Sequence, residues 1–563
     1  MRRARRIGII GLTLALLAPL APAGTPLVAP ASASGGAAFE VAFGNSGPTR
    51  YPTVGQVTRS SSPTIADING DGENDIVIGH QDGMLRVFDA DGGTIWEKPA
   101  VLDGRPGCAG SPPGLGTAID STPTVADLDG NGTMEIIVGV GSTWVPDQPG
   151  GLVVFNNDGS KRWDFQGIDE QDIWADIQVL DGYCEGTYST PAVGDIDGDG
   201  YKDIVFGSWD LRIYALDRNG DMIPGFPYKH GDTVWSSPAL YDSDGDGRDE
   251  IFIGGDMGYD PFEQWTGGIY RALDWQAGRV VQMWKARSEE VYASSSAIGD
   301  IDNDGRMEIV IGSGEYFHSV YNSAQGDNMR VWAYNIEDGS PVAGWPVTTG
   351  GTVFSSPAIG DLDGDGKEDD VVIGSNDTKL WAFRGDGSVL WSKALADSVQ
   401  AVPPGQIQAP PIIADLDGNG TQDVAVGTAF AMFFVRGSDG AQLQTAIPRI
   451  SFGNAPAVGN FGSEGWQVVA AGFQPGTTSG SWITKLWAFS IPTPGSTPDW
   501  PHWRKNSDAT AAPDGSYTIP AATDGYWMVE EDGAVYGFGG VSTMSPGLPP
   551  FGHKALSLDT TPD

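Results

Sequence analysis

One seven-residue phrase recurs along the chain and restricts the folds that the chain can adopt. It reads SSPTIAD at residues 61–67, STPTVAD at 121–127 and STPAVGD at 189–195. Further copies lie at residues 236–242, 294–300, 355–361, 409–415 and, in a weaker form, 454–460. Successive copies start 45 to 68 residues apart. Such a period indicates a repeat protein, in which each unit buries its apolar face against its neighbours.

Each repeat carries the pattern of four short strands. The phrase is followed by a turn rich in Asp and Gly, a β-branched run that ends in Gly, such as residues 76–79, and an alternating strand, such as residues 85–89. A glycine turn then leads to a strand that usually contains an aromatic residue, around Trp96, Trp163, Phe226, Trp284, Trp345, Trp391 or Trp500. No window has a sustained helical period. The sequence therefore predicts an all-β fold, a β-propeller of eight four-stranded blades, with seven blades as the alternative because the last copy is degenerate.

The turn after the phrase has a fixed acidic pattern, Asp-x-Asp/Asn-x-Asp/Asn-Gly-x-x-Asp/Glu, in seven of the repeats. Oxygens at its first, third and fifth positions can converge on one point, the Gly allows a sharp turn, and the ninth residue returns a carboxylate from the next strand. The predicted metal ligands are Asp67, Asn69, Asp71, Asp75, Asp127, Asp129, Asn131, Glu135, Asp195, Asp197, Asp199, Asp203, Asp242, Asp244, Asp246, Glu250, Asp300, Asp302, Asp304, Glu308, Asp361, Asp363, Asp365, Asp369, Asp415, Asp417, Asn419 and Asp423. In the sixth of these loops Asp370 follows Asp369 directly and is the alternative last ligand.

Hard oxygen ligands without His or Cys suit Ca²⁺, and they suit Mg²⁺ or Mn²⁺ less well. Asp and Gly are also good turn formers, but seven copies at one spacing favour a metal site over a plain turn. The residues after each loop are β-branched, whereas an EF-hand needs a helix there. We therefore predict Ca²⁺ as the cofactor, with up to about seven ions held on β-hairpins. The weaker eighth copy has Asn460, Gly462, Glu464 and Val468 instead, and we expect it not to bind.

The stretch SSPAIGDLDGDGKEDDVVIG at residues 355–374 resembles the FG-GAP/VCBS repeat family, as does STPAVGDIDGDGYKDIVFG at residues 189–207. That family includes the propeller heads of integrin α subunits and many secreted bacterial proteins. The resemblance covers roughly residues 61–505. It implies a calcium-binding, integrin-α-like β-propeller whose metal ligands are the loop positions named above. Because the family includes adhesion, carbohydrate-linked and enzyme-appended members, the resemblance implies fold and metal more than activity.

The N-terminus has the pattern of a signal peptide. Four arginines in the first six residues precede an apolar run at residues 7–20, and ASA at residues 31–33 supplies a small-residue cleavage site. A membrane anchor is the alternative, but the run is short for a bilayer, and no later segment could span one.

The exported chain would meet an oxidising compartment, in which disulfides form. Cys108 and Cys184, which each follow the tetrapeptide VLDG in loops before consecutive repeats, are therefore predicted to form a disulfide, with two free thiols as the alternative.

The domain organisation follows from these segments. We predict a signal peptide at residues 1–33, a lead-in at 34–60, the propeller at 61–505, a polar linker at 506–523 and a short β-repeat at 524–563. The stretch GYWMVEEDGAVYGFG at residues 525–539 is similar to a β-repeat that occurs in tandem on secreted actinobacterial proteins. Residues 555–563 look like the start of the next copy, so this last repeat is predicted to be incomplete.

Charge and loop lengths indicate the class of partner. With 73 Asp and Glu against 32 Lys and Arg, the net charge is −41, which disfavours nucleic acid and anionic membranes as partners.

In a four-stranded blade the long insertions would emerge on the face opposite the acidic loops. They lie at residues 101–120, 140–151, 165–188, 255–268, 313–330 and 474–484. Exposed aromatic residues beside carboxylates suit sugars or a protein partner. The predicted ligand-face residues are Trp144, Trp174, Tyr259, Trp265, Tyr316 and Trp482, the alternative being that these side chains only pack their own loops.

The sequence shows no catalytic signature. None of its five histidines is paired at metal-ligand spacing, and it has neither a Gly-x-Ser-x-Gly elbow nor a phosphate-binding glycine motif. We therefore predict a secreted, calcium-binding propeller that binds an extracellular glycan or protein, free or at the cell surface, and is not an enzyme. The first alternative is a calcium-dependent, lyase-like enzyme acting on polysaccharides, and the second is a scaffold whose metal sites serve folding alone. The ligand, the mode of cell-surface attachment and the oligomeric state stay open.

Overall fold

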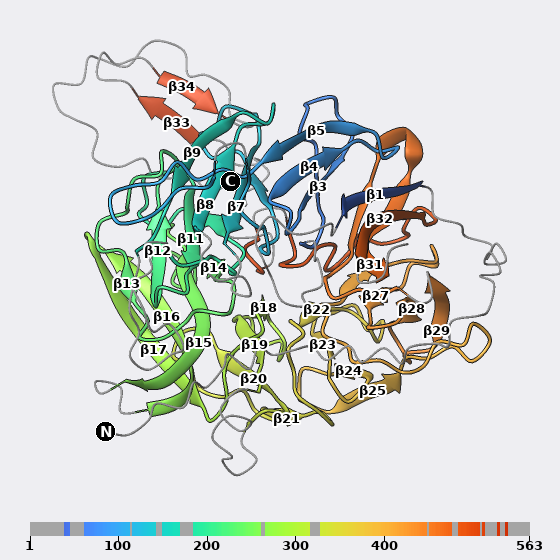
Figure 1. Ribbon diagram of the computed structural model, residues 1–563. Coiled ribbons are helices and arrows are strands. Elements are labelled where there is room, and N and C mark those ends of the chain that lie inside the picture. Colours follow the sequence, from blue (N-terminus) through green and yellow to red (C-terminus); the bar gives the residue numbers. More distant parts are fainter. Residues whose placement is uncertain are drawn as a thin grey trace, which may run out of the picture. The chain divides into compact units, whose positions relative to one another are not determined.

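Eight four-stranded antiparallel sheets form a ring in the computed structural model of the protein, which confirms the predicted eight-bladed β-propeller (Figure 1). The structure describes residues 39–45, 61–112, 115–141, 149–168, 184–260, 265–315, 327–446, 450–475, 482–506, 509–512, 526–529 and 535–538. Among these residues the only helical element is the short 3₁₀ turn η1 (Gly462–Glu464).

Seven blades are built from four strands that follow one another in the chain. Blades one to three contain β2 (Thr64–Ala66), β3 (Asp75–Gly79), β4 (Met84–Phe88) and β5 (Thr94–Pro99); β6 (Thr124–Ala126), β7 (Glu135–Val140), β8 (Gly151–Phe155) and β9 (Lys161–Phe165); and β10 (Ala192–Gly194), β11 (Asp203–Gly207), β12 (Arg212–Leu216) and β13 (Tyr228–Lys229). Blades four and five contain β14 (Ala239–Tyr241), β15 (Glu250–Asp260), β16 (Trp265–Gln276) and β17 (Arg279–Ser288); and β18 (Ala297–Gly299), β19 (Glu308–Gly312), β20 (Arg330–Asn335) and β21 (Val347–Thr348). Blades six and seven contain β22 (Ala358–Gly360), β23 (Asp370–Gly374), β24 (Lys379–Phe383) and β25 (Val389–Ala394); and β26 (Ile412–Ala414), β27 (Asp423–Gly427), β28 (Met432–Arg436) and β29 (Gln442–Ala446).

The eighth blade joins the two ends of the propeller. Its first three strands are β30 (Ala457–Asn460), β31 (Trp466–Pro475) and β32 (Trp482–Ser490), and its fourth is β1 (Phe39–Asn45). β1 pairs antiparallel with β32, with Val41 opposite Leu486. The prediction that the fourth strand lies around Trp500 is therefore wrong, because the N-terminal strand takes that edge. A sheet completed from both ends of the chain closes the ring and removes a free strand edge.

The apolar core lies between neighbouring blades. The second strands, such as β3 (DIVIG) and β11 (DIVFG), are buried along their whole length. A strand covered on both faces needs a continuous apolar run, which is what these segments have. Val77 of β3 and Val138 of β7 belong to one buried cluster, although they come from different blades. Each blade is thus stabilised by the surface that it buries against the next.

The hydroxyls of the recurring phrase link the blades around the ring. At the first position, Ser236 Oγ donates to the carbonyl of Gly254 (2.8 Å) and accepts from its N–H (2.7 Å), which attaches the phrase to the second strand. At the second position, the N–H of Thr190 donates to Ser237 Oγ of the next blade (2.9 Å). In blade eight the N–H of Ala455 donates to Ser62 Oγ of blade one (3.1 Å), which closes the ring. These contacts explain why the phrase recurs.

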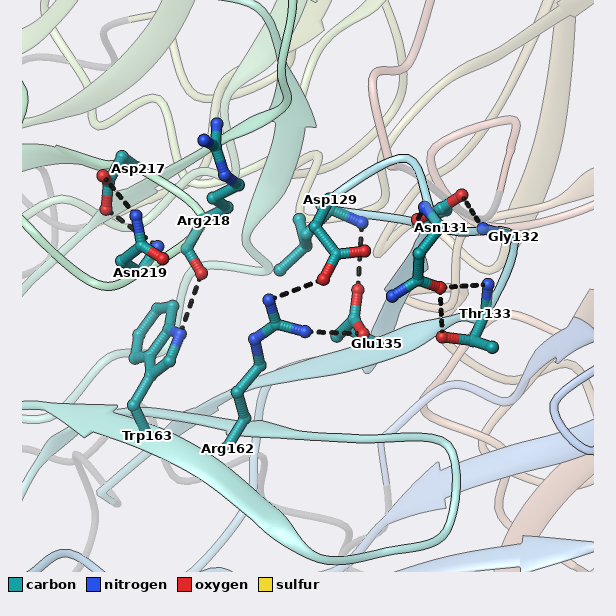
Figure 2. Close-up of polar contacts among 12 residues, drawn as sticks. Asp129, Asn131, Gly132, Thr133, Glu135, Arg162, Trp163, Asp217, Arg218 and Asn219 are labelled. Atoms are coloured by element: carbon teal, nitrogen blue, oxygen red, sulfur yellow. Dashed lines mark hydrogen bonds and ion pairs between the residues drawn. The ribbon is translucent and has the colours of Figure 1, made fainter.

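Tryptophans of the fourth strands also join neighbouring blades. The indole N–H of Trp163 donates to the carbonyl of Arg218 in blade three (3.0 Å), as Figure 2 shows. The indole N–H of Trp284 makes the same contact with Ile336 in blade five (2.7 Å). A Cβ added at Gly339 would lie only 2.5 Å from the Trp284 ring, so this turn needs glycine. The aromatic residue of the predicted fourth strand therefore fixes the angle between two blades.

The segment after blade eight runs along the ring axis. Backbone N–H groups of four first strands donate to its carbonyls: Leu240 to Thr510, Ile298 to Ala511, Ile413 to Trp500 and Val458 to Pro501, at 2.8 to 3.0 Å. First strands form the inner edge of their sheets, so a segment that pairs with four of them occupies the centre of the ring. Trp500 is only 2% exposed. The described start of the predicted linker, Asn506 and residues 509–512, also lies here, with Ala509, Ala511 and Ala512 buried.

Arg504 is the most polar residue of this axial segment and is 1% exposed. Its guanidinium donates to the backbone carbonyls of Ser296 (2.5 Å) and Pro238, which lie beside the first strands of blades five and four. Burial lowers the pKa of Arg504 to about 9. The side chain therefore binds backbone carbonyl groups of two neighbouring blades. These hydrogen bonds fix the axial segment to the ring.

Cys108 and Cys184 form the predicted disulfide, with their Cα atoms 5.2 Å apart. Both residues are buried, Cys108 in the connection between blades one and two and Cys184 in the connection between blades two and three. The bond therefore joins two consecutive connections across blade two, as the shared position in neighbouring repeats predicts.

The chain divides into two compact units, Met1–Ala512 and Pro513–Asp563. Within the second unit, β33 (Tyr526–Val529) pairs antiparallel with β34 (Val535–Phe538). These strands fall within the segment for which a short β-repeat is predicted. In the described parts of the chain, no helix has the length and apolarity needed to span a bilayer.

Candidate metal centres and the opposite face

The acidic loops, numbered here one to seven after their blades, are organised by their first aspartate. In loop four, Asp242 Oδ1 accepts from the N–H of Gly245 (2.7 Å) and Oδ2 from the N–H of Gly247 (2.9 Å). Gly247 has a φ of 87°, which disfavours any residue with a Cβ. The fourth position is left-handed as well, with Gly245 at 77° and Asn303 of loop five at 59°. This second requirement was not part of the predicted pattern, and Asn meets it because it tolerates this conformation.

The last carboxylate of each loop returns from the second strand of the blade. Glu250 Oε2 of β15 accepts from the N–H of Ser243 (2.7 Å), and Asp203 Oδ2 of β11 accepts from the N–H of Ile196 (3.0 Å). Both carboxylates are buried. Because one oxygen binds the loop backbone, the other is free to face the same point as the first, third and fifth side chains.

The predicted ligands converge in space. Carboxylate oxygens lie within 4.8 Å of one another in several loops, namely Asp242, Asp244, Asp246 and Glu250; Asp127, Asp129 and Glu135; Asp195, Asp197 and Asp199; Asp300, Asp302 and Asp304; and Asp361, Asp363 and Asp365. So many carboxylates at this separation repel one another unless a cation or protons lie between them. These clusters could each hold a metal ion.

Unpartnered oxygens in the loops fit a hard cation. Glu308 Oε1, Asp370 Oδ1 and Asp423 Oδ1 are buried and have no hydrogen-bond partner among the described residues, and each belongs to a closing carboxylate. Asp129 Oδ1 and Asp363 Oδ1, at the third position of their loops, are in the same state. A buried acceptor without a partner is costly, and all-oxygen donor sets match Ca²⁺. The residues present therefore fit the predicted ion.

Loop six closes with Asp370 and not with Asp369. Asp370 Oδ2 accepts from the N–H groups of Leu362 (3.1 Å) and Asp363 (2.9 Å), which is the contact that the ninth residue makes in the other loops. Asp369 Oδ2 instead accepts from the side chain of Asn303 in the neighbouring loop five (2.6 Å). The extra acid of this loop therefore shifts the closing position by one residue, and Asp369 links two adjacent loops.

Burial makes the closing carboxyls weak acids when no metal is bound. It raises the pKa to about 6 for Asp75, about 7 for Glu250, Asp370 and Asp423, and about 8 for Asp203 and Glu308. Neighbouring carboxylates of the same loop raise the pKa further, while hydrogen bonds from the loop backbone oppose the shift. In the calcium-free protein these groups are therefore partly protonated near neutral pH.

The raised pKa values predict how stability depends on pH. Between about pH 4 and pH 8 the unfolded chain has lost these protons while the folded, calcium-free protein still holds them. The free energy of unfolding of the calcium-free protein should therefore fall as pH rises through this window. Calcium must displace the same protons, so its stabilising effect should grow over the same range. Melting temperatures at pH 5 and pH 8, in EGTA and in Ca²⁺, check this. A calcium-free protein that melts higher at pH 8 than at pH 5 would contradict it.

The connections that contain the predicted insertions begin and end on the face opposite the acidic loops. Because neighbouring strands are antiparallel, the connections between second and third strands, and those between blades, begin and end on that face. Of the predicted ligand-face residues, Trp144, Trp174 and Tyr316 lie outside the described residues, as do the side chains of Tyr259 and Trp482. Trp265 is described, and the guanidinium of Arg287 lies 5.3 Å from its ring centre. Its indole N–H has no hydrogen-bond partner in the described parts of the chain.

A cluster of aromatic side chains that the sequence did not single out lies on the same face. The rings of Trp209 and Trp235 are 4.6 Å apart at an angle of 60°, and the ring of Tyr188 is 6.2 Å from Trp235. All three side chains are half-buried. The indole N–H of Trp209 has no hydrogen-bond partner in the described structure. We call Tyr188, Trp209 and Trp235 the aromatic cluster.

A buried carboxylate forms a hydrogen bond with one member of this cluster, Trp235. Thr233 Oγ1 donates to Asp256 Oδ1 (2.5 Å), and Trp235 provides Asp256 with a second hydrogen bond. Burial raises the pKa of Asp256 well above its usual range, and the neighbouring Asp232 raises it further. The position of Trp235 is therefore fixed by a buried polar group. A sequence signal existed, because Tyr188 and Trp235 each stand directly before a copy of the recurring phrase, where the chain enters a first strand.

Comparison with protein families identifies the repeats. The profile of the FG-GAP-like repeat matches residues 67–138, 195–253, 300–372 and 361–426. These four segments cover all seven acidic loops. No curated protein matches the chain.

Comparison with solved structures finds similar chains at low sequence identity. BamB from Moraxella catarrhalis is 12% identical, covering 77% of this chain and 98% of its own, with a TM-score of 0.43. Quinohemoprotein alcohol dehydrogenase from Comamonas testosteroni is 13% identical over 80% of each chain (TM-score 0.46). The rhamnogalacturonan lyase of Bacillus licheniformis is 14% identical, covering 80% of this chain and 75% of its own (TM-score 0.34). At such low similarity none of them carries an argument about activity.

Proposed function

The chain belongs to the FG-GAP-like repeat proteins, and on that premise we propose that it is a secreted, calcium-stabilised propeller that binds an extracellular glycan or protein. In this proposal residues 1–33 direct export, the acidic loops hold calcium on one face, and the opposite face binds the partner. Residues 34–60, 61–505, 506–523 and 524–563 keep the predicted roles of lead-in, propeller, linker and C-terminal repeat, except that β1 within the lead-in and the start of the linker pack with the propeller.

The calcium role is supported by the chemistry of the loops. Their donors are oxygens alone, several carboxylates lie within 4.8 Å of one another, and closing carboxylates have buried oxygens without partners. Each loop joins the first and second strands of its blade. An ion held there would therefore stabilise the hairpin next to the ring axis and cancel part of the net charge of −41.

The binding role rests on the aromatic cluster. Three half-buried rings lie together on the face that carries the long connections. Aromatic faces pack against the apolar faces of sugar rings, and an indole N–H donates to a hydroxyl. The rings of the cluster would therefore suit the apolar face of a sugar, and they would also suit an aromatic hot spot of a protein interface.

Binding assays with aromatic variants test this role. Trp209→Ala and Tyr188→Ala should each weaken binding of the best ligand on a glycan array by about tenfold or more, because truncating a buried aromatic anchor costs this much. The matched control is Trp275→Ala, since Trp275 lies near the end of β16 on the other face, where its N–H donates to Pro224 (2.8 Å). Melting temperatures of the three variants should stay close to that of the parent protein.

Two results would contradict the glycan role. Binding that survives both Trp209→Ala and Tyr188→Ala would place the partner elsewhere. Release of unsaturated sugars from pectic or uronic polymers would instead indicate the lyase-like enzyme. If no glycan binds but pull-down from culture supernatant yields a partner that Trp209→Ala loses, the partner is a protein.

A further inference from the structure

A guanidinium from the fourth strand of blade two reaches acidic loop two. Arg162 of β9 donates through Nη1 to Glu135 Oε1 (2.8 Å) and through Nη2 to Asp129 Oδ2 (2.9 Å), as Figure 2 shows. Glu135 is the closing carboxylate of this loop, and its other oxygen accepts from the N–H of Leu128 (3.0 Å). Both oxygens of Glu135 are therefore already bound. The guanidinium bridges the third and the ninth positions, between which an ion would lie.

The closing carboxylates of other loops differ on this point. Glu308 Oε1, Asp370 Oδ1 and Asp423 Oδ1 hold the place of Glu135 Oε1 in loops five, six and seven, and they have no partner among the described residues. Each of these three side chains is at most 1% exposed. In loop two one oxygen, Asp129 Oδ1, is left without a partner. Loop two thus lacks the unpartnered oxygen on the closing carboxylate that loops five, six and seven have.

The fold does not require an arginine at this place. Arg162 is the extra residue of a β-bulge in the pairing of β8 with β9, between the partners Lys161 and Trp163. The same bulge occurs in four other blades, where the extra residues are Ile95, Met283, Leu390 and Leu443. All four are apolar and pack against the core between blades. Blade two therefore differs from these four blades at the bulge. In loop six Arg384 contacts the third-position Asp363 (3.2 Å), but the closing Asp370 keeps an oxygen without a partner among the described residues.

We propose that Arg162 takes the role of the metal ion in loop two, so that this loop is stable without calcium and binds it at least about tenfold more weakly than the other loops. The inference rests on the proposed calcium role and adds that the sites are not equivalent. A fixed guanidinium repels a divalent ion and occupies oxygens that the ion would need. Because blade two also carries the disulfide connections on either side, it would stay closed when the calcium concentration falls.

Calcium titration of arginine variants tests the inference. Isothermal titration of calcium-stripped protein should show one tight site fewer than the number of acidic loops. Arg162→Leu, which restores the side-chain type of the other bulges, and Arg162→Gln, which removes only the charge, should each gain one tight site. In EGTA both variants should melt lower than the parent, because loop two then has carboxylates without a counter-charge. Anomalous diffraction should show an ion in loop two of Arg162→Leu crystals grown at a calcium concentration that leaves the parent loop empty.

The control is Arg330→Leu, since Arg330 lies at the start of β20 on the opposite face and pairs with Asp327 (3.2 Å). Its number of tight sites should equal that of the parent protein. The inference is overturned if parent and Arg162 variants bind the same number of ions with the same affinities. It fails together with the calcium role only if neither the parent nor any variant binds calcium, so the two failures can be distinguished.

Discussion

Removal of calcium with EDTA at pH 8 is expected to lower the melting temperature by about 10–20 °C. A site whose free ligand concentration is about 100 times its dissociation constant adds about 2.7 kcal/mol to the free energy of unfolding, and about six such loops would add roughly 16 kcal/mol. The loops that lose their ions would keep carboxylates within 4.8 Å of one another. Differential scanning calorimetry in 1 mM Ca²⁺ and after chelation measures the shift.

The matched control alters one loop alone. Asp302→Asn with Asp304→Asn removes two carboxylates from loop five and leaves the backbone contacts of Asp300 in place. We expect this variant to lose about a sixth of the calcium-dependent shift, because one of about six ions is lost. A melting temperature that EDTA does not change, or that magnesium restores as well as calcium does, would contradict a calcium role.

Removal of the axial segment is also expected to destabilise the ring strongly. A chain that ends at Ser490 loses four backbone hydrogen bonds to first strands, the buried ring of Trp500 and the guanidinium of Arg504. Its free energy of unfolding should fall by at least about 5 kcal/mol, because apolar surface and backbone groups at the ring axis become unpartnered. Urea unfolding followed by tryptophan fluorescence measures this, with calcium kept constant.

The control chain ends at Ala512 and keeps the whole axial segment. We expect it to be as stable as the full-length protein, because the division between the two compact units follows Ala512. Arg504→Ala in the full-length chain should lose about 3 kcal/mol, since the carbonyls of Pro238 and Ser296 lose their donor. Equal stability of the chains ending at Ser490 and at Ala512 would show that the segment adds nothing to the ring.

Features that repeat could be predicted from the sequence, because several copies at one spacing distinguish a structural pattern from a chance run of residues. The phrase, the acidic loop and the fourth-strand aromatic residue recur with one spacing, and the structure assigns each of them a role that is the same in successive blades. Ser237 and Ser62, for example, accept the same hydrogen bond in different blades. The number of blades followed from counting these copies.

Features that occur once could not be predicted in the same way. β1 completes blade eight from the other end of the chain, and nothing local in its sequence names β32 as its partner. The segment around Trp500 was predicted to be a fourth strand of the propeller, and its position along the ring axis with Arg504 buried could not be read from the sequence. Arg162 was not singled out in the sequence, because its contact with loop two depends on the bulge at this position. In each case a long-range contact decides the role.

The calcium content of the native protein tests the central claim most directly. Protein purified in calcium and dialysed against metal-free buffer should retain about six Ca²⁺ per chain by inductively coupled plasma mass spectrometry, one for each acidic loop except loop two. Retention of less than one ion per chain, together with an unchanged melting temperature, would show that the acidic loops are turns and not metal sites.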